Sequence, residues 1–297
     1  MMQEVLSQAG HHVEVHGLTP PGRLSRTVSL LASGGYPWDL TIHTERAVSP
    51  WMELSRRNLL LPNPEWFELT PAAKKVDAIL CKTRWTFEIM SSLHPRAIFT
   101  GFTSLDRSLA GVSAAELTPL HVVGRSATKG TSALLRAWRR NPAWPELTVV
   151  AWKKGLPIPD DLPPNVTVRR EFVDDAELQR LQASCGFHLC PSAAEGFGHT
   201  LVEGMSAGAL VLTTDAPPMN ELVTADRGIL VPWSVSEPMR AGTRFEVDPD
   251  RLEEKIAEAF TAPPGRNRAL AVAARQWFEE NDAEFRRRLV QVIDEVL

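Results

Sequence analysis

The sequence has few cysteines, little net charge and no long apolar run, and each shortage excludes a class of protein. Its three cysteines, Cys81, Cys185 and Cys190, lie in or beside apolar stretches, which argues against a disulfide framework or a zinc site and for reduced core thiols. A net charge of −4 offers no basic surface to a nucleic-acid backbone. We therefore expect no bound metal and no nucleic-acid partner.

Apolar runs of about 18 residues or more, which a membrane span requires, are also missing. The first residues lack the basic and apolar regions of a signal peptide. With 297 residues, 43% of them hydrophobic and 23% charged, the chain has the composition of a globular protein and the length for two domains. These observations predict a two-domain cytoplasmic protein.

Short apolar segments alternate with helical patterns along the chain, and such an alternation indicates parallel sheets covered on both faces. The sequence therefore predicts an α/β fold in two halves. The expected strands lie at residues 13–15, 40–42, 78–81 and 97–100 in the first half, and at 121–123, 147–152, 166–168, 186–190, 210–214 and 228–231 in the second.

Neither an internal repeat nor a low-complexity linker separates the two halves. We assign residues 1–114 to a shortened N-terminal domain, 115–272 to a C-terminal domain and 273–297 to a helical tail that crosses back to the first domain. The helical pattern of the tail begins near Arg268, and we expect an interruption near Asn281.

The most informative stretch runs from Pro191 to Met205 and joins an expected strand to a glycine-flanked loop and a helix start. Such a helix start binds anions, because its unpaired backbone N–H groups and its dipole point at the loop. Glu195 and Glu203 stand eight positions apart in this stretch, and carboxylates beside an anion site suit neutral hydroxyls. Phosphate together with hydroxyls indicates a nucleotide sugar as the ligand.

A second loop, residues 124–130, follows an expected strand and carries Arg125 and Lys129. Two cations held after a strand can stabilise the charge that grows on a departing diphosphate. The alternative is that both cations are surface charges, and that Glu195 and Glu203 are solvated or cap helices.

With both loops in place, the chain resembles glycosyltransferase family 4, the retaining nucleotide-sugar transferases of the GT-B fold. Residues 124–130 are similar to the family's diphosphate motif and residues 195–203 to its paired-glutamate motif. Residues 207–214 and 220–223 match the two segments that come next in the family, in the same order and spacing. The resemblance implies a GT-B-like α/β fold in which two Rossmann-like domains with parallel sheets face a cleft.

The resemblance also implies roles for individual residues. Arg125, Lys129 and Glu195 would be catalytic: the cations stabilise the diphosphate, and Glu195 orients the donor sugar. Glu203 would accept hydrogen bonds from the ribose hydroxyls, and Val173 would border the nucleobase through its main chain. The other donor-binding residues that it implies are Gly124, Gly196, Phe197, Gly198, His199, Thr200 and Leu201.

Two histidines have open roles. His199 either donates to the sugar or phosphate or fills a polar niche at the helix start. Family members place a histidine of the N-terminal domain near the sugar, and His43 is the counterpart by position, unless it is a partly buried loop residue.

The sequence departs from the family pattern at several places. Ala209 stands where proline is usual, and Gly204 where alanine is common. Residues 9–13 resemble the end of the family's first helix, so we expect either that the start site is placed too late or that the family's N-terminal side is reduced here. The sequence therefore specifies a donor and leaves the acceptor side undefined.

Two ligand motifs fail on closer reading. Asp248-Pro249-Asp250 resembles a metal-holding aspartate pair, but it precedes an amphipathic helix with Glu253 in place, so a capping box at Asp250 is the better interpretation. Gly196-Phe197-Gly198 lacks the third glycine of a dinucleotide fingerprint, because that position is Leu201.

The three consecutive arginines 286–288, beside Phe285, suggest peripheral contact with a membrane. Acidic residues on the same helix favour a solvated face instead.

We therefore expect a metal-independent, cofactor-free glycosyltransferase of the hexosyltransferase type. It would move a sugar from a nucleoside diphosphate sugar to a carbohydrate, lipid or protein hydroxyl with retention of configuration. The resemblance implies a front-face mechanism in which the departing phosphate oxygen helps to remove the acceptor proton. The alternative is a non-catalytic nucleotide-sugar-binding partner or regulator of a complete glycosyltransferase.

Overall fold

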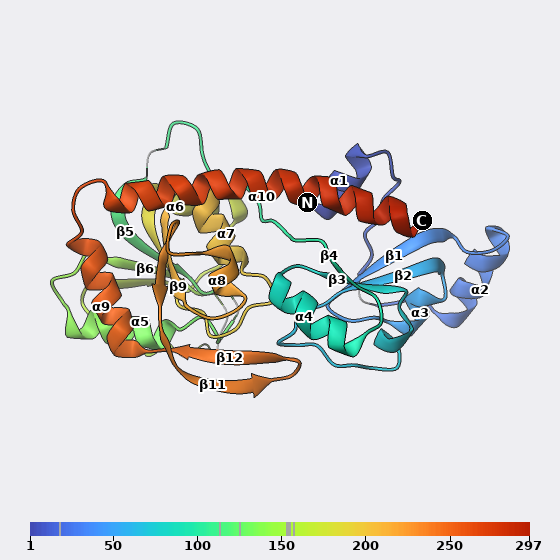
Figure 1. Ribbon diagram of the computed structural model, residues 1–297, viewed down its shortest axis with the longest axis horizontal. Helices are drawn as coiled ribbons and strands as arrows, with labels where there is room; N and C mark the ends of the chain where they lie inside the picture. Colours follow the sequence, from blue (N-terminus) through green and yellow to red (C-terminus); the bar gives the residue numbers. More distant parts are fainter. Residues whose placement is uncertain (18, 113, 125, 153–155, 157) are drawn as a thin grey trace. The chain divides into compact units, whose positions relative to one another are not determined.

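The computed structural model describes residues 1–17, 19–112, 114–124, 126–152, 156 and 158–297, which form two compact units (Figure 1). The first unit contains Met1–Phe102, Pro238–Gly242 and Asp282–Leu297, and the second contains Thr103–Glu237 and Thr243–Asn281. Residues 103–114, which the sequence assigns to the N-terminal domain, thus belong to the second unit. The tail is shared between the units and divides at Asn281.

A four-stranded parallel sheet with the order β1-β2-β3-β4 forms the centre of the first unit. Leu60 on β2 and Ile79 on β3 are fully buried in it. The hydrophobic pattern of the sequence does not predict β2, because two exposed arginines stand in its first half, before the apolar residues. The strands are β1 (Trp38–Thr44), β2 (Ser55–Leu61), β3 (Ala78–Cys81) and β4 (Ala97–Phe99).

The prediction of a strand at residues 13–15 is wrong, since this segment has no regular secondary structure. Val15 is 73% exposed, so two valines around a glutamate bury too little apolar surface to hold a strand. The helices of the first unit are α1 (Met2–Gln8), α2 (Arg23–Ala32), α3 (Ser49–Met52), the 3₁₀ helix η1 (Ala73–Lys75), α4 (Arg84–Leu93) and the end of α10 (Arg266–Val296).

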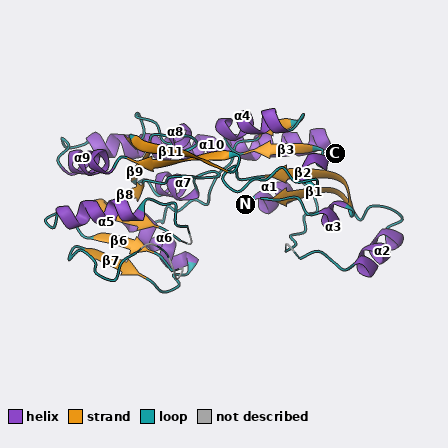
Figure 2. Ribbon diagram, turned by 90° about the horizontal axis from the view of Figure 1, so that it is seen from below, coloured by secondary structure: helices purple, strands orange, loops and turns teal. Residues whose placement is uncertain are grey.

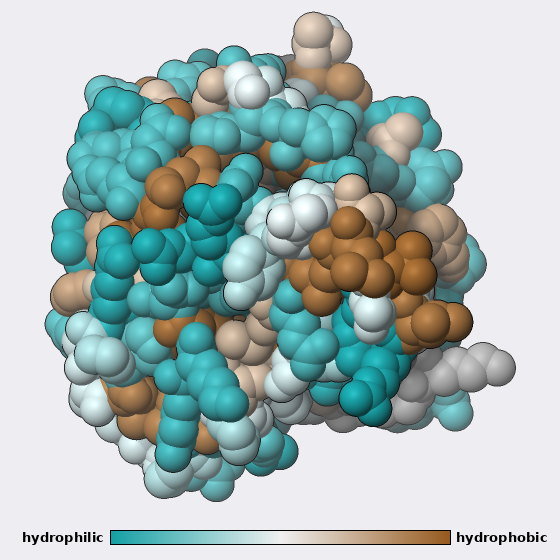
Figure 3. Space-filling model, turned by 90° about the vertical axis from the view of Figure 1, so that its right-hand side faces the viewer, coloured by the Kyte–Doolittle hydropathy of each residue, from teal (hydrophilic) through white to brown (hydrophobic). Residues whose placement is uncertain are grey.

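Helix α2 turns an apolar face to solvent. Leu24, Val28 and Leu31 recur at helical spacing and are exposed, and none of the ten residues of α2 is buried. Figure 3 views the molecule from the α2 side and shows hydrophobic residues gathered on that surface among hydrophilic ones.

The second unit is built on a six-stranded parallel sheet with the order β10-β9-β8-β5-β6-β7. Figure 2 labels four of these strands, β9, β8, β6 and β7. Its strands are β5 (Ala115–Val122), β6 (Leu147–Val150), β7 (Val166–Arg169), β8 (Cys185–Cys190), β9 (Leu210–Thr214) and β10 (Ile229–Val231). Its helices are α5 (Thr131–Arg140), α6 (Asp175–Ser184), α7 (His199–Ser206), α8 (Met219–Leu222), α9 (Pro249–Phe260) and the first part of α10.

Both faces of this sheet are covered. Val149 of β6 packs in a cluster with Leu134 of α5 and Leu252 of α9. Its neighbour Val150 packs in a separate cluster with Leu178 of α6. Successive side chains of a strand point to opposite faces, so helices cover each side. The predicted α/β fold with two Rossmann-like, parallel-sheet units is confirmed.

The sequence pattern does not predict the hairpin that lies between β10 and α9. Its strands are β11 (Trp233–Met239) and β12 (Gly242–Val247). Nearly all of β11 is exposed, so it lacks the alternation of buried and exposed residues that marks a half-buried strand. Arg240 at the turn adopts a positive φ of 57°, which is unusual for a residue other than glycine.

Two helix starts differ by one or two residues from the prediction. Asp174, not Asp175, caps α6, because its carboxylate accepts a hydrogen bond from the backbone N–H of Glu177. Asp248, not Asp250, caps α9 in the same way. The preference for a cap over a metal ligand at this aspartate pair stands, with the cap moved to its first member.

The expected interruption of the tail helix near Asn281 is wrong. Helix α10 runs without a break from Arg266 to Val296, and it contains neither proline nor glycine. The polar residues at this position mark the point where the helix passes from the second unit to the first. Phe285, which adjoins the three arginines, is 1% exposed and packs against Phe102, so it is a core residue.

All three cysteines are free and buried, as predicted. Burial raises the pKa of Cys81 and Cys190 to about 12, so both thiols stay protonated at neutral pH. None of the helices in the described ranges is long and apolar enough to cross a bilayer.

Two histidines of the second sheet are almost completely buried. His121 on β5 bonds through Nδ1 to the carbonyl of Leu189 at 2.7 Å and through Nε2 to Thr131 Oγ1 at 2.9 Å. His188 on β8 bonds through Nε2 to the carbonyl of Gln182 at 3.1 Å. Burial lowers the pKa of each histidine to about 4.

We expect the free energy of unfolding to fall as the pH is lowered from about 6.5 to about 4. In this window the unfolded chain binds a proton at each histidine and the folded chain does not, so acid favours unfolding. The loss is on the order of 3 kcal/mol per histidine. Urea unfolding at several pH values should show a shallower pH dependence in His188→Gln. Replacing the exposed His12 by Gln is the matched control, and equal slopes in the wild type and His188→Gln would contradict the prediction.

Candidate donor site

Two loops meet at the carboxyl edge of the second sheet. Strands β5 and β8 pair in parallel, so the loops that come after them leave the sheet side by side. The backbone N–H of Ala193 donates to the carbonyl of Thr128 at 2.7 Å and joins the two loops directly. Open α/β sheets bind ligands at this edge.

Glycine at position 130 allows this close approach. Gly130 precedes α5 with a φ of +71°, and a Cβ built on it would lie 2.1 Å from the carbonyl oxygen of Pro191. Gly198 precedes α7 with a φ of +114°. Glycine tolerates these positive φ angles, which other residues resist. Both helices can therefore begin where the two loops touch.

Lys129 and Glu195, predicted from separate motifs, form an ion pair across the two loops. Lys129 Nζ lies 2.5 Å from Glu195 Oε1 and 3.3 Å from Thr200 Oγ1. The side chains of Lys129 and Glu195 are only 12% and 11% exposed, so both charges are withdrawn from most of the solvent. Arg125, the other predicted cation, lies outside the described residues.

The start of α7 separates side chains that reach the loop from those that enter the core. Phe197 and Leu201 are 3% and 0% exposed, so a ligand could meet them only through the main chain. His199 Nδ1 lies 2.8 Å from Ser104 Oγ, a hydrogen bond that occupies this ring nitrogen. Ser104 gives His199 a polar partner at the helix start, and its donation to the sugar or phosphate stays a prediction.

Glu203 lies one turn into α7, in a nearly closed polar pocket. Its side chain is 14% exposed. Gln182 Nε2 donates to Glu203 Oε2 at 2.8 Å, and Arg107 Nη2 lies 3.5 Å from Oε1. Burial raises the pKa of Glu203, and its hydrogen bond with Gln182 and the charges of Arg107 and Lys129 oppose that rise. No motif or periodicity marks Gln182 or Arg107 in the sequence, so sequence reasoning misses both.

The other predicted positions have simple surroundings. Val173 is 7% exposed and packs with Leu120 and Val150. Gly124 has a φ of +60° and open space around its Cα. Gly196 is buried in the loop.

Both mild departures from the family pattern have a steric or hydrogen-bonding reason. A Cβ at Gly204 would lie 2.8 Å from Nδ1 of the buried His188, so alanine does not fit. The backbone N–H of Ala209 donates to the carbonyl of Gly204 at 3.1 Å, and proline would lack this donor. The buried histidine thus explains one departure and a helix-end hydrogen bond the other.

His43 belongs to the first unit and lies within β1. It is 6% exposed, and its Nε2 lies 2.9 Å from Oδ1 of Asn58 on the adjacent strand. Burial lowers its pKa. His43 is therefore a strand residue hydrogen-bonded to its neighbour, and the expectation of a partly buried loop residue is wrong.

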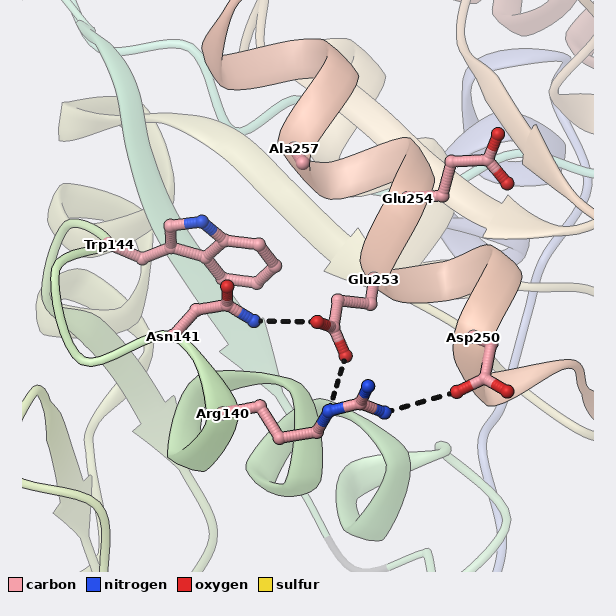
Figure 4. A pocket seen from close by; sticks show the side chains of 7 residues that line it. All are labelled: Arg140, Asn141, Trp144, Asp250, Glu253, Glu254 and Ala257. Atoms are coloured by element: carbon pink, nitrogen blue, oxygen red, sulfur yellow. Dashed lines mark hydrogen bonds and ion pairs between the residues drawn. The ribbon is translucent and has the colours of Figure 1, made fainter.

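A cavity of about 320 Å³ lies between α5 and α9 (Figure 4). Arg140 bonds to Asp250 and Glu253 there, and Asn141 also bonds to Glu253 (Figure 4). The cavity adjoins the last residues of α5, whereas Lys129 precedes the first residue of that helix. The cavity is therefore separate from the two loops. Among the residues that the structure describes, no group of three or more His, Cys, Asp or Glu is placed to hold a metal ion.

Comparisons with known proteins show which family this part of the chain resembles. Residues 119–262 match the family model of the group 1 glycosyl transferases. The matched segment is just under half of the chain and contains both loops and α7. A search of curated proteins finds no match to the sequence.

Solved glycosyltransferase structures share the fold over nearly the whole chain. Sucrose-phosphate synthase from Thermosynechococcus elongatus superimposes with a TM-score of 0.72 at 15% identity, covering 99% of this chain and 91% of its own. WaaG, a glycosyltransferase involved in lipopolysaccharide biosynthesis, gives 0.65 at 15% identity, with coverage of 98% and 94%. An E. coli structure described as trehalose-6-phosphate bound with UDP-2-fluoro glucose gives 0.65 at 11% identity, with coverage of 92% and 76%. The fold is that of a GT-B glycosyltransferase.

The contact between the loops leads to a test with two glycines. We expect Gly130→Ala to lower the free energy of unfolding by more than about 3 kcal/mol, because the left-handed backbone and the overlap with Pro191 both oppose a Cβ. Gly124→Ala in the same loop carries a similar φ without the overlap, and should cost about 1–2 kcal/mol. Urea unfolding measures both. Equal losses would show that the loops are not in close contact at Gly130.

Proposed function

We propose that the protein transfers a glycosyl unit from a nucleoside diphosphate sugar to an acceptor hydroxyl with retention of configuration, as a metal-independent hexosyltransferase of family 4. The observation that carries the proposal is the Lys129–Glu195 pair beside Thr200 at the start of α7. This cluster lies inside the segment that matches the group 1 glycosyl transferases.

The two halves of the donor call for different groups, and the site offers both. A diphosphate needs cations and N–H donors, which Lys129, by resemblance Arg125, and the first turn of α7 can supply. Sugar and ribose hydroxyls need acceptors, which Glu195 and Glu203 can supply. The E. coli relative of the same fold was solved with UDP-2-fluoro glucose, which supports a nucleotide sugar as the donor.

The ion pair between Lys129 and Glu195 can serve both the phosphate and the sugar of the donor. Lys129 and Glu195 neutralise each other at a site that excludes most solvent. When a diphosphate approaches, Lys129 can donate one of its three N–H bonds to phosphate while another stays on Glu195. Glu195 keeps a free lone pair for a sugar hydroxyl, so one pair positions both sides of the bond that breaks.

The proposed reaction exchanges one bond for another. The bond between the anomeric carbon and the phosphate oxygen breaks, and a bond between that carbon and the acceptor oxygen forms on the same face. The acceptor proton moves to the departing phosphate oxygen, and the diphosphate leaves with its charge stabilised by Lys129 and Arg125. Glu195 holds the sugar in place during the transfer.

A non-catalytic nucleotide-sugar-binding role is the second candidate, and it is not favoured. It is not favoured because the segment that holds the Lys129–Glu195 pair matches the group 1 glycosyl transferases. Donor hydrolysis by the wild type would separate the candidates.

We expect the wild type to hydrolyse or transfer at least one sugar from a panel of UDP-, GDP- and ADP-sugars, and to do so in the presence of EDTA. Lys129→Ala and Arg125→Ala should each lower the rate about 10²–10³-fold, because each removes one contact to the charge that develops. Glu203→Ala should act mainly through weaker donor binding.

Lys255→Ala on α9 is the matched control, since that lysine pairs with Glu258 on the surface of the helix. Release of labelled sugar, resolved by chromatography, measures the rates, and NMR of the product's anomeric proton reads the configuration. Wild-type activity in the Lys129 and Glu203 variants would refute the assignment of the site, and an inverted product would refute retention.

A further inference from the structure

We infer that Arg107 is a positioning residue for the donor: it holds Glu203 in the orientation that accepts the ribose hydroxyls. This inference rests on the proposed function, because it assigns Glu203 to the ribose. Arg107 lies in the segment between β4 and β5, outside the motifs that mark the donor site.

Arg107 reaches Glu203 from a separate part of the chain. Its guanidinium bridges two acidic residues: Nη1 donates to Asp175 Oδ1 of α6 at 2.7 Å, and Nη2 lies 3.5 Å from Glu203 Oε1 of α7. The residue is 6% exposed, while Asp175 is 70% exposed. Asp175 therefore anchors the guanidinium at the surface, and Glu203 receives its inner side.

The backbone around Arg107 is fixed as well. Its N–H donates to Ser206 Oγ at 2.9 Å, and Ser206 lies at the end of the helix that carries Glu203. Next to it, both carboxylate oxygens of Asp106 bond to Arg275 of α10, at 2.7 and 2.8 Å. The segment thus cannot shift along α7 without breaking several bonds, which gives Arg107 a fixed distance to Glu203.

A buried carboxylate needs such a partner to stay both ionised and oriented. Burial favours its neutral form, and a protonated Glu203 would offer one acceptor fewer to a ribose hydroxyl. The groups that face Glu203 are Gln182 of α6, Arg107, Lys129 and the neutral Cys190 of β8. Arg107 contacts Glu203 directly, with Nη2 3.5 Å from Oε1, so it is the cation whose removal affects Glu203 most.

The test measures nucleotide binding by calorimetry between pH 5 and pH 8.5. UDP, GDP and ADP are screened on the wild type, and the tightest binder is then compared with its 2′-deoxy and 3′-deoxy forms. The wild type should prefer the intact ribose about tenfold or more, because hydrogen bonds to a charged group are strong. Arg107→Met should reduce this preference to about twofold or less.

The pH dependence gives a second readout with a definite sign. Binding needs the ionised Glu203 and fades as the pH falls through its pKa. Removing the cation raises that pKa, so the midpoint in Arg107→Met should move up by about one pH unit. Arg107→Lys, which keeps the charge, should restore most of the wild-type midpoint.

For the surface variant Asp175→Asn we expect the opposite shift of the pH midpoint. This variant tests the role of Arg107 even if Arg107→Met does not fold. It removes a negative charge and leaves Arg107 to Glu203, so the midpoint should move down by a fraction of a pH unit. Arg139→Met is the matched control, since Arg139 pairs with Asp161 on the surface and contacts neither this segment nor Glu203, so it should leave the midpoint unchanged.

The outcomes separate the two proposals. A wild type that binds none of the three nucleotides overturns the proposed function, and this inference with it. A wild type that binds, with the same ribose preference and the same midpoint in Arg107→Met, overturns the role of Arg107 alone. An unchanged midpoint in Asp175→Asn overturns it as well.

Discussion

The parallel pairing of β5 with β8 is the constraint on which the candidate site depends. It sets two loops side by side although more than sixty residues separate them in the chain. Gly130 lets these loops touch, and the contact brings Lys129 within reach of Glu195. The donor site is thus a consequence of strand order, because parallel strands deliver all the loops at their carboxyl ends to one edge of the sheet.

Charge within this site is organised in pairs that burial makes interdependent. Lys129 neutralises Glu195, and Arg107 faces Glu203, so two cations and two carboxylates occupy neighbouring positions of low exposure. Each carboxylate keeps acceptor capacity for hydroxyl groups, while the cations keep N–H donors for phosphate or for holding a carboxylate. An arrangement of this kind suits a ligand with a charged centre and neutral ends, as a nucleoside diphosphate sugar has.

Much of the fold could be predicted, because short apolar strands between helices have few other solutions. The failures have local causes: β2 begins with exposed arginines, β11 is exposed along nearly its whole length, and the valines at 13–15 bury too little surface. In the site, Lys129 and Glu195 stood out because they belong to spaced motifs. Gln182 and Arg107 belong to none, so only the packing of their elements shows that they reach Glu203.

The sequence by itself determined the fold class and the burial of the free cysteines, and it carries the two motifs from which the ligand is proposed. These properties depend on local composition and spacing, which chain order preserves. Tertiary structure decided which charges meet, including the contact between Arg107 and Glu203. It also placed His188 where a Cβ at position 204 would lie, which excludes alanine there. Such facts depend on distances between residues far apart in the chain, and only the packing of strands and helices sets those distances.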